Sequence, residues 1–180
     1  MKNAPQFCDA DPVTQYGNVV ALTQEYFEWM NAEIVRACAI SIPDLVGKTI
    51  DEYVRLTMQR MSTVDPREGT FHLVMIGNEA VAMGGLRRLP DGAAEIVRIY
   101  TRPAFRGRGY GRKIMDHLIA RARDLDYLIV RLDTAKFMHS AHRIYYSLGF
   151  KDCQPYAGAE PPDQLKPIWL YMEKDLASSH

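Results

Sequence analysis

Apolar residues recur about every 3.6 positions in two early segments, so each segment is predicted to form an amphipathic helix. The first helix is expected to begin at Asn18, whose side chain can cap the helix N-terminus. Its apolar face is formed by Val19, Leu22, Tyr26, Trp29 and Met30. A break marked by Pro43 and Gly47 precedes the second helix, which is predicted over residues 50–61. Residues 7–8, ahead of both, are either a short first strand or part of a mobile terminus.

The middle of the chain has the apolar runs and turn residues of antiparallel strands. Runs over residues 71–76 and 79–83 flank Gly77-Asn78, which predicts a hairpin with a short turn. A further strand is expected from Glu95 to Thr101, and Pro103 then stops it. Strands joined by such tight turns form an antiparallel meander.

A third helical pattern opens after Gly111, and its apolar face is predicted to lie in the core. That face consists of Ile114, Met115, Leu118, Ile119, Ala122 and Leu125. Residues 127–132 follow as a strand that is nearly apolar throughout, as expected for a strand covered on both faces. Asp133-Thr134 is expected to end this strand.

Two more elements complete the pattern. Residues 141–148 have helical spacing, and Gly149 is suitably placed as a C-cap. Residues 168–176 are predicted to form a closing strand. The fold class is therefore predicted to be α+β, with a central mixed, mostly antiparallel sheet flanked by helices on both faces. Periodicity alone also allows other domains of this class.

Length and composition indicate the number of domains and the cellular location. With 180 residues, of which 47% are hydrophobic and 24% charged, the chain 1–180 is expected to be one globular domain with a sizeable core. No apolar run reaches the length of a membrane span and the N-terminus lacks an apolar signal core. The cytoplasm is therefore the expected location, without a membrane partner.

Cysteine and histidine spacing predicts no metal. The three cysteines are scattered and form neither a Cys-x-x-Cys pair nor a cluster with histidine, which argues against a zinc site and a disulfide framework. The histidines likewise show no metal-ligand spacing; they are His72, His117, His139, His142 and His180.

The charge distribution draws attention to the segment between Ile96 and Met115. It holds six Lys or Arg and no acid, whereas the whole chain balances 22 basic against 22 acidic residues. Gly107, Gly109 and Gly111 alternate there between a strand and a helix. Glycines let backbone N–H groups approach an anion and the helix dipole favours negative charge, so this segment is predicted to bind a phosphate group. The alternative is a solvated turn. The dinucleotide-binding and Walker patterns both fail here.

The order Arg-x-x-Gly-x-Gly, at residues 106–111, resembles the pyrophosphate-binding signature of the GNAT superfamily, the acyl-CoA-dependent N-acetyltransferases. The resemblance implies acetyl-CoA as the cofactor. It assigns the CoA pyrophosphate to the loop and the helix N-terminus, and the pantetheine arm to the preceding strand. The cofactor-binding residues implied in this way are Ile99, Tyr100, Thr101, Arg106, Gly107, Arg108, Gly109, Tyr110, Gly111 and Arg112.

A second stretch, residues 141–150, resembles the short GNAT helix that closes on Leu-Gly-Phe. In many members its tyrosine donates a proton to the leaving CoA thiolate, and that role falls here on Tyr145. The adjacent Tyr146 stays open, and the alternative for Tyr145 is a core tyrosine. The resemblance covers roughly residues 71–176 and implies that the helical region 18–61 walls the acceptor site.

Acyl transfer to an amine also needs a group that takes the amine's proton. A lysine-like amine has a pKa near 10.4, so only about one in 10³ is neutral at pH 7. Family members often place a base on the cofactor strand, which makes Glu95 the candidate general base. The alternative is a surface carboxylate paired with Arg98 or another cation. Alternation puts residues 95, 97, 99 and 101 on one face of this strand, unless a bulge intervenes.

These observations lead to a functional expectation. The chain is expected to be an acetyl-CoA-dependent N-acetyltransferase, with the primary amine of a small molecule, amino acid or peptide as acceptor. The alternative is a non-catalytic CoA-binding module of the same fold. A nucleic-acid partner is not expected, because the net charge is zero and the basic run is short. Residues 155–167 could form a substrate wall, a contact in a homodimer or a plain loop.

Overall fold

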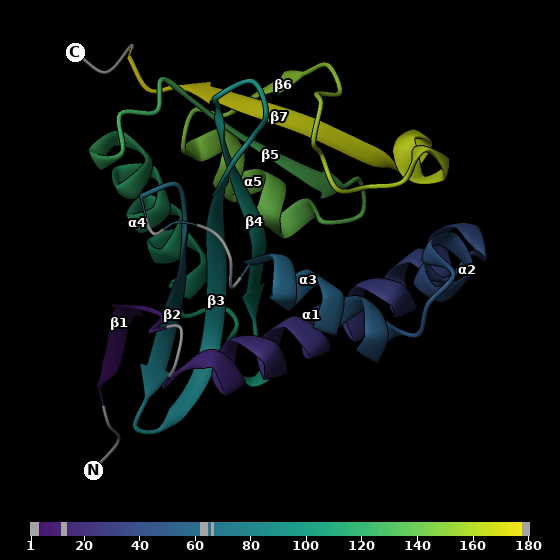
Figure 1. Ribbon diagram of the computed structural model, residues 1–180, viewed down its shortest axis with the longest axis horizontal. Helices are drawn as coiled ribbons and strands as arrows, with labels where there is room; N and C mark the ends of the chain where they lie inside the picture. The colour runs from purple at the N-terminus through teal and green to yellow at the C-terminus, as the bar shows by residue number, and fades with distance from the viewer. Residues whose placement is uncertain (1–3, 12–13, 62–64, 66, 178–180) are drawn as a thin grey trace.

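A seven-stranded sheet with helices on both faces organises the chain (Figure 1). This computed structural model describes residues 4–11, 14–61, 65 and 67–177. The strand order is β1-β2-β3-β4-β5-β7-β6. The strands are β1 (Pro5–Asp9), β2 (Thr70–Ile76), β3 (Glu79–Arg88), β4 (Ala94–Thr101), β5 (Ile129–Ala135), β6 (Lys151–Cys153) and β7 (Trp169–Asp175). The helices are α1 (Tyr16–Cys38), α2 (Ile42–Val46), α3 (Ile50–Met61), α4 (Tyr110–Asp124) and α5 (His139–Ser147), with the 3-10 turns η1 (Pro103–Phe105) and η2 (Asp163–Ile168).

The sheet is antiparallel except at its centre. Strands β1 to β4 form a meander, and β7 pairs antiparallel with both β5 and β6. Strands β4 and β5 are parallel, but they share only the pairs Ala94–Val130 and Glu95–Arg131. Beyond Glu95 the two strands diverge, so the edge of β4 that faces β5 is left outside the ladder. The predicted α+β class, with its mixed and mostly antiparallel sheet, is confirmed.

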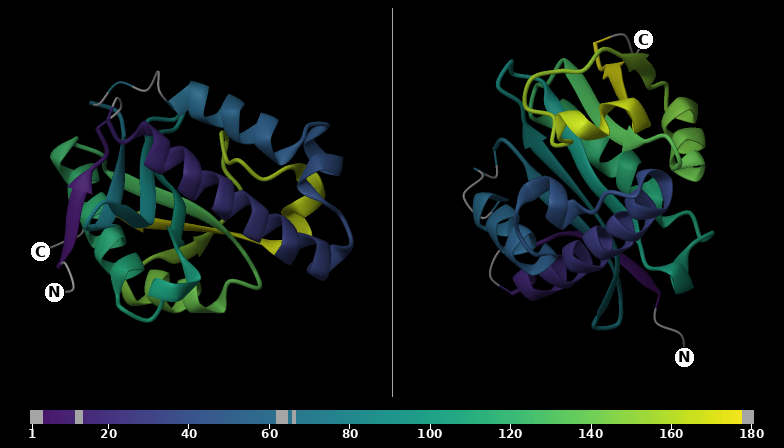
Figure 2. Two further views of the ribbon diagram at one scale, coloured as in Figure 1. Left: turned by 90° about the horizontal axis from the view of Figure 1, so that it is seen from below. Right: turned by 90° about the vertical axis from the view of Figure 1, so that its right-hand side faces the viewer.

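Two hydrophobic clusters cover the two faces of the sheet (Figure 2). Helix α4 packs on one face, and its core contacts include Ile114, Met115 and Leu118, as its spacing predicts. Helices α1 and α3 cover the other face through Leu22, Met58 and their neighbours. Each face thus has its own core, and the divergence of β4 from β5 lies between the two.

Several element boundaries differ from the sequence-based predictions. Helix α1 begins at Tyr16 rather than at Asn18, because the preceding turn is closed by Asp11, which accepts a 2.6 Å hydrogen bond from the Thr14 N–H. Helix α4 begins at Tyr110, since Gly109 already serves as its N-cap. The strand predicted to end before Asp133-Thr134 instead continues to Ala135.

The extension of β5 has a clear cause in its pairing. Strand β7 pairs with β5 over its whole length, from Ile129–Asp175 to Ala135–Trp169, and this ladder includes Asp133. Leu128 lies outside the strand and is 69% exposed, so the predicted start at residue 127 was two positions early. The short strand β6 was not predicted at all.

The other local predictions hold. The hairpin around Gly77, helix α3 and the C-terminal position of Gly149 (φ +85°) are confirmed, and residues 7–8 belong to a strand. The side chain of Met61 and His180 lie outside the described residues. Among the helices that the structure describes, none combines the length and the apolar character that a membrane span requires.

Candidate active site

The glycine-rich loop forms a bend that only glycine adopts readily. Gly107 (φ +76°) and Gly109 (φ +79°) both have left-handed backbone conformations, and a Cβ at either would meet nothing within 4 Å. The backbone dihedral angles, not lack of space, therefore require glycine at these positions. Gly109 is the N-cap of α4. The N–H groups of the first turn of α4 have no acceptor within the helix and point toward the loop. The chain thus presents backbone donors and a helix N-terminus in one place.

A long groove runs from this loop along the end of β4 to α5. Nine of the ten residues predicted to bind the cofactor line it: Ile99, Tyr100, Thr101, Arg106, Gly107, Gly109, Tyr110, Gly111 and Arg112. Helix α5 contributes His139 and Arg143. Arg108 is not among the lining residues; its guanidinium lies over the Phe105 ring at 5.1 Å and donates to the Ala104 carbonyl.

Two guanidinium groups are held at the wall of this groove. Arg106 donates to the Thr101 carbonyl at 3.1 Å and stacks over the Trp29 ring at 5.2 Å. Both partners of Arg106 are neutral, so its positive charge stays available for an anion. Arg112 donates to the Ser147 hydroxyl at 2.8 Å and pairs with Asp116 on the next turn of α4. The groove thus combines cationic side chains with backbone N–H donors at the start of α4, which suits a pyrophosphate.

A bulge in β4 interrupts its alternation. Val97 pairs with Gly85 and Tyr100 with Met83, so Arg98 and Ile99 together face Gly84. Arg98 has φ +55°, which is unusual for a residue other than glycine. Its buried side chain forms an ion pair with Glu160. The expected alternation of residues 95 to 101 therefore fails at this point, as a bulge requires.

Glu95 is fully buried, which differs from the surface carboxylate considered as an alternative. Its carboxylate accepts hydrogen bonds from Arg87 Nε at 2.6 Å and from the Tyr156 hydroxyl at 2.7 Å. Burial raises the pKa of Glu95, and the positive charge of Arg87 opposes this rise. Its cationic partner is thus Arg87 and not Arg98.

A small chamber lies where β4 and β5 diverge. It is lined by residues of both strands, including Arg98, Ile99, Asp133 and Thr134, and by Tyr145 of α5. Tyr145 is buried, and burial together with the negative charge of Asp133 raises the pKa of its hydroxyl.

The neighbouring tyrosine points elsewhere. Tyr146 is 49% exposed and donates a 2.7 Å hydrogen bond to Asp152. It is not among the residues that line the chamber. The choice between the two tyrosines, open from the sequence, therefore favours Tyr145 on position.

Asp133 is the site residue that the sequence interpretation missed. Its carboxylate accepts a 2.7 Å hydrogen bond from the Trp169 indole. The Asp133 side chain is partly buried, and part of its surface lines the chamber. Burial, reinforced by the negative charge of Glu95, raises its pKa to about 7. The sequence did offer a signal for this residue, because Asp133 follows the apolar run 127–132. Asp133 was interpreted only as a residue that ends the strand.

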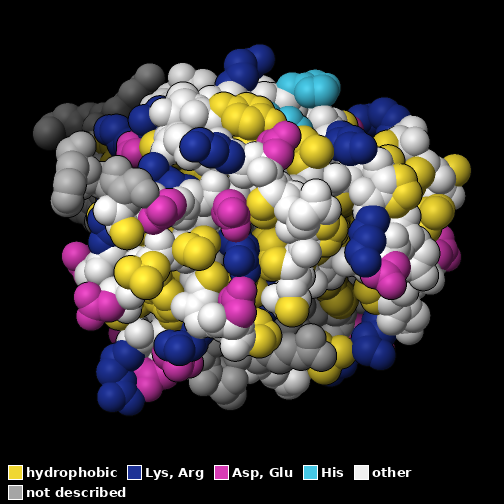
Figure 3. All heavy atoms as spheres, turned by 90° about the horizontal axis from the view of Figure 1, so that it is seen from above, with side chains coloured by type: hydrophobic (Ala, Val, Ile, Leu, Met, Phe, Trp, Pro, Cys, Tyr) yellow, Lys and Arg dark blue, Asp and Glu magenta, His cyan; other side chains and the backbone are white. Residues whose placement is uncertain are grey.

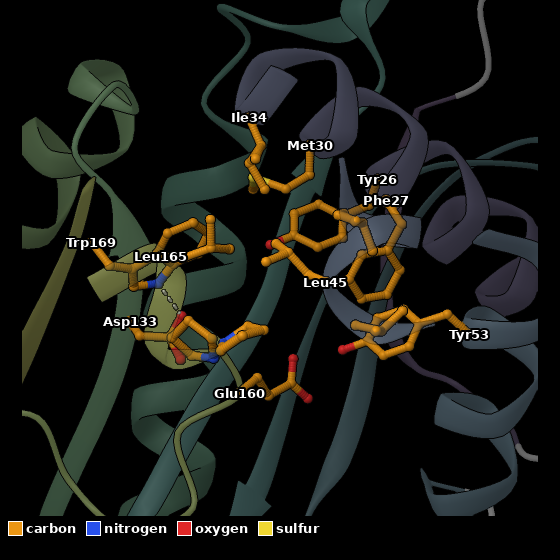
Figure 4. Close-up of a pocket in the computed structure, with 14 residues that line it drawn as sticks. Tyr26, Phe27, Met30, Ile34, Leu45, Tyr53, Asp133, Glu160, Leu165 and Trp169 are labelled. Carbon is orange, nitrogen blue, oxygen red and sulfur yellow. Dashed lines mark hydrogen bonds between the residues drawn. The ribbon is translucent and has the colours of Figure 1, made fainter. Parts of the chain in front are cut away.

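A second cavity, the apolar pocket, opens on the other side of the chamber (Figure 4). It takes residues from α1, α2, α3 and the segment before β7, and it shares Tyr26, Asp133 and Trp169 with the chamber. The chamber in turn shares Ile99 and Met138 with the groove. The chamber therefore lies beside both the groove and the apolar pocket, separated from each by shared side chains. Within the predicted loop 155–167, residues 160–162 and 165 form a wall of this pocket.

The four described histidines lie in two separate regions of the fold. His139 lines the groove, while His142 is buried, with Nε2 3.0 Å from the Ala135 carbonyl. Far along the sheet, His72 and His117 both contact the Asp9 carboxylate, at 3.2 and 3.0 Å. Potential ligand atoms of these three residues lie within 4.8 Å of one another. They come from β1, β2 and α4, so no spacing in the sequence indicated this group.

Comparison with known proteins identifies the family to which this fold belongs. The chain belongs to the acetyltransferase (GNAT) family, whose model matches residues 26–150, and the predicted family resemblance is confirmed. Among similar proteins is the uncharacterized N-acetyltransferase YsnE of Bacillus subtilis, 26% identical over 140 residues that cover 68% of this chain and 93% of that protein.

Solved structures share the fold over almost the whole chain. The putative acyl-CoA N-acyltransferase of Klebsiella pneumoniae superposes with a TM-score of 0.69 at 24% identity, covering 96% of this chain and 97% of that one. The PaiA N-acetyltransferase of Thermoplasma acidophilum, solved in complex with coenzyme A, superposes with a TM-score of 0.68 at 15% identity, covering 96% and 99%. Acetyl-CoA is the cofactor that this family uses.

Proposed function

We propose that the protein transfers the acetyl group of acetyl-CoA to the primary amine of a small molecule, an amino acid or a peptide. The observation that carries this proposal is that three cavities adjoin one another. A groove suited to CoA adjoins a chamber with a tyrosine and an acid, and an apolar pocket adjoins the chamber in turn. A module that only held CoA would need the groove but neither the chamber nor the pocket.

The cofactor fits the groove by its chemistry. Arg106, Arg112 and the N-terminus of α4 would hold the pyrophosphate. The edge of β4 from Ile99 to Thr101 would hydrogen-bond the pantetheine arm, because β5 no longer pairs with it there. When bound, acetyl-CoA supplies an activated acyl group and a thiolate that can leave.

Tyr145 is proposed as the proton donor to that thiolate. Its raised pKa keeps the hydroxyl protonated at neutral pH, as a donor must be. Its position in the chamber supports this role.

For the proton of the amine, we propose Asp133 as the acceptor. Asp133 borders both the chamber and the apolar pocket, whereas Glu95, the residue suggested by the sequence, is engaged by Arg87 and Tyr156. A pKa of about 7 suits a base near neutral pH. Glu95 would then act on Asp133 through its charge, which raises the pKa of the Asp133 carboxyl.

The test begins with thermal unfolding in the presence and absence of acetyl-CoA. Ligand at a hundred times its dissociation constant stabilises the folded chain by about 2.7 kcal/mol. We expect a clear upward shift in Tm for the wild type and its loss in the Arg106→Ala/Arg112→Ala double variant.

Two single variants sharpen this test. Arg108→Ala should keep most of the shift, because its guanidinium lies over Phe105 and not on the groove. Arg36→Ala, an exposed arginine of α1, is the matched control for lost surface charge. A wild type that acetyl-CoA does not stabilise, or that releases no thiol with any amine, would contradict the proposed function.

A further inference from the structure

The apolar pocket restricts which amine can reach the chamber. Most of its wall is apolar or aromatic, and helix α1 supplies Tyr26, Phe27, Met30 and Ile34. Helix α2 adds Leu45, which is labelled in Figure 4. Resting on the proposed function, we propose that the acceptor is a primary amine carrying one compact apolar group, aryl or branched alkyl, and no carboxylate.

The aromatic residues favour a flat or branched apolar group. The rings of Phe27 and Tyr53 meet edge to face at 5.0 Å, and Trp169 closes the side next to the chamber. Full burial of a group the size of a phenylalanine side chain is strongly favourable in such surroundings. A small polar amine would leave this wall unfilled.

The polar groups of the pocket are acids. Its lining includes the carboxylates of Asp133 and Glu160, both labelled in Figure 4, and among the described residues that line it there is no Lys or Arg. Glu160 is already matched by Arg98, whose side chain is 2% exposed. Within the part of the chain that the structure describes, Asp133 has the Trp169 indole as hydrogen-bond donor and forms no ion pair. Asp133 is therefore free to receive an ammonium group.

The same charges disfavour an acceptor with a carboxylate beside its amine. An α-amino acid that placed its nitrogen near Asp133 would bring its own carboxylate close to that of Asp133, and the Glu160–Arg98 pair beside it offers no net positive charge. The nearby cation, Arg98, is directed to Glu160. Free amino acids should thus be rejected even when their side chains are apolar.

The transfer balances with residues already described. The ammonium group would first pass one proton to the Asp133 carboxylate. The neutral nitrogen would then form a bond to the acetyl carbon as the carbon–sulfur bond breaks, and the departing sulfur would take the proton of the Tyr145 hydroxyl. The second proton released by the nitrogen would return to the Tyr145 oxygen, which leaves one proton on Asp133 to pass to solvent. No oxidant, reductant or further co-reactant is required.

A panel of matched amines tests the inference, with thiol release measured at saturating acetyl-CoA. The probes are 2-phenylethylamine, 3-methylbutylamine, ethylamine, phenylalanine and spermidine. We expect kcat/KM for 2-phenylethylamine to exceed that for ethylamine by at least about 10-fold, from burial of the ring. It should exceed that for phenylalanine by about 100-fold, from the added carboxylate.

A pocket variant links this preference to the cavity. Leu45→Trp should lower kcat/KM for 2-phenylethylamine by about 10-fold or more and for ethylamine much less, because the new ring occupies the space of the apolar group. Val35→Trp is the matched control, since Val35 lies on α1 with 44% of its surface exposed and outside the pocket. The stabilisation by acetyl-CoA should be the same in both variants.

The outcomes separate this inference from the proposed function. If acetyl-CoA neither binds nor is turned over, the proposed function itself fails. If acetyl-CoA binds and the best acceptor is phenylalanine, spermidine or ethylamine, the acceptor class is wrong while the enzyme stands. Binding of acetyl-CoA without turnover of any amine in the panel also overturns the acceptor class, and equal loss in Leu45→Trp and Val35→Trp overturns its assignment to this pocket.

Discussion

At the scale of single residues, the site depends on how three acids, the buried Glu95 and the partly buried Asp133 and Glu160, are compensated. Glu95 is matched by Arg87 and Glu160 by Arg98, while Asp133 has only the neutral indole of Trp169 as its hydrogen-bond donor among the described residues. A carboxylate without a cation in low-dielectric surroundings holds its proton to higher pH, which explains the pKa of about 7. The residue best suited to exchange protons is thus the one with the least compensated charge.

The pH dependence of activity should identify the base. Asp133 accepts a proton only when ionised, so kcat/KM of the wild type should rise with pH through about 7. Asp133→Asn should abolish this rise and lower kcat/KM by about 10² or more. Glu95→Gln should keep the rise but move it to lower pH, because the charge that raises the pKa of Asp133 is gone. A rise that vanishes in Glu95→Gln and persists in Asp133→Asn would instead make Glu95 the base.

Tyr145 and Tyr146 provide a comparison between adjacent hydroxyl groups. Tyr145→Phe should lower kcat by about 10²-fold, because the thiolate loses its proton donor, while the thermal stabilisation by acetyl-CoA is retained. Tyr146→Phe, on the exposed side of α5, should leave kcat within about twofold of the wild type. Steady-state kinetics and unfolding curves of both variants check this prediction, and equal loss of kcat in the two would refute it.

At the scale of elements, the bulge of β4 requires a close approach from β3. A Cβ at Gly84 would lie 2.5 Å from Ile99 Cδ1 and 2.6 Å from Ile114 Cγ2, so the glycine allows α4 and the bulge to pack against the sheet. Those neighbours belong to the core, where side chains have little room to move.

This packing predicts a contrast between two glycines. Gly84→Ala should destabilise the protein by about 1–3 kcal/mol through overpacking. Gly17→Ala, in helix α1 with nothing within 4 Å of the added Cβ, should stabilise it by about 0.5–1 kcal/mol. Urea denaturation of both variants measures the difference, and a neutral Gly84→Ala would mean that the bulge adapts without strain.

Elements that depend on local signals could be predicted from the sequence. The hairpin at Gly77 and helix α3 follow from turn chemistry and helical period, and both formed as expected. The end of β5 could not be predicted, because Asp133 remains in the strand only through pairing with β7, some 35 to 40 residues later in the chain.

At the scale of the whole molecule, the site also has one part that local sequence signals predict and one part that they do not. The groove was predictable because its glycines and arginines are contiguous at residues 106–112, and their spacing has a direct physical meaning. The apolar pocket was predictable only in outline, through the helical region 18–61 and the loop 155–167. Its individual lining residues were not, because α1, α2, β5 and the segment before β7 each supply only part of its wall. The surface gives no further guidance: in Figure 3 basic and acidic side chains are interspersed, in keeping with the formal net charge of zero.

The adjoining arrangement of groove, chamber and apolar pocket has a kinetic consequence. Among the described residues, the groove and the pocket share no lining residue and each borders the chamber, so acyl donor and amine would reach the reaction point from separate sides. Neither would need to leave before the other enters. The geometry therefore favours a ternary complex with direct transfer between the two substrates, without an acyl group resting on the protein, and it lets the acetylated product depart while the spent cofactor is still bound.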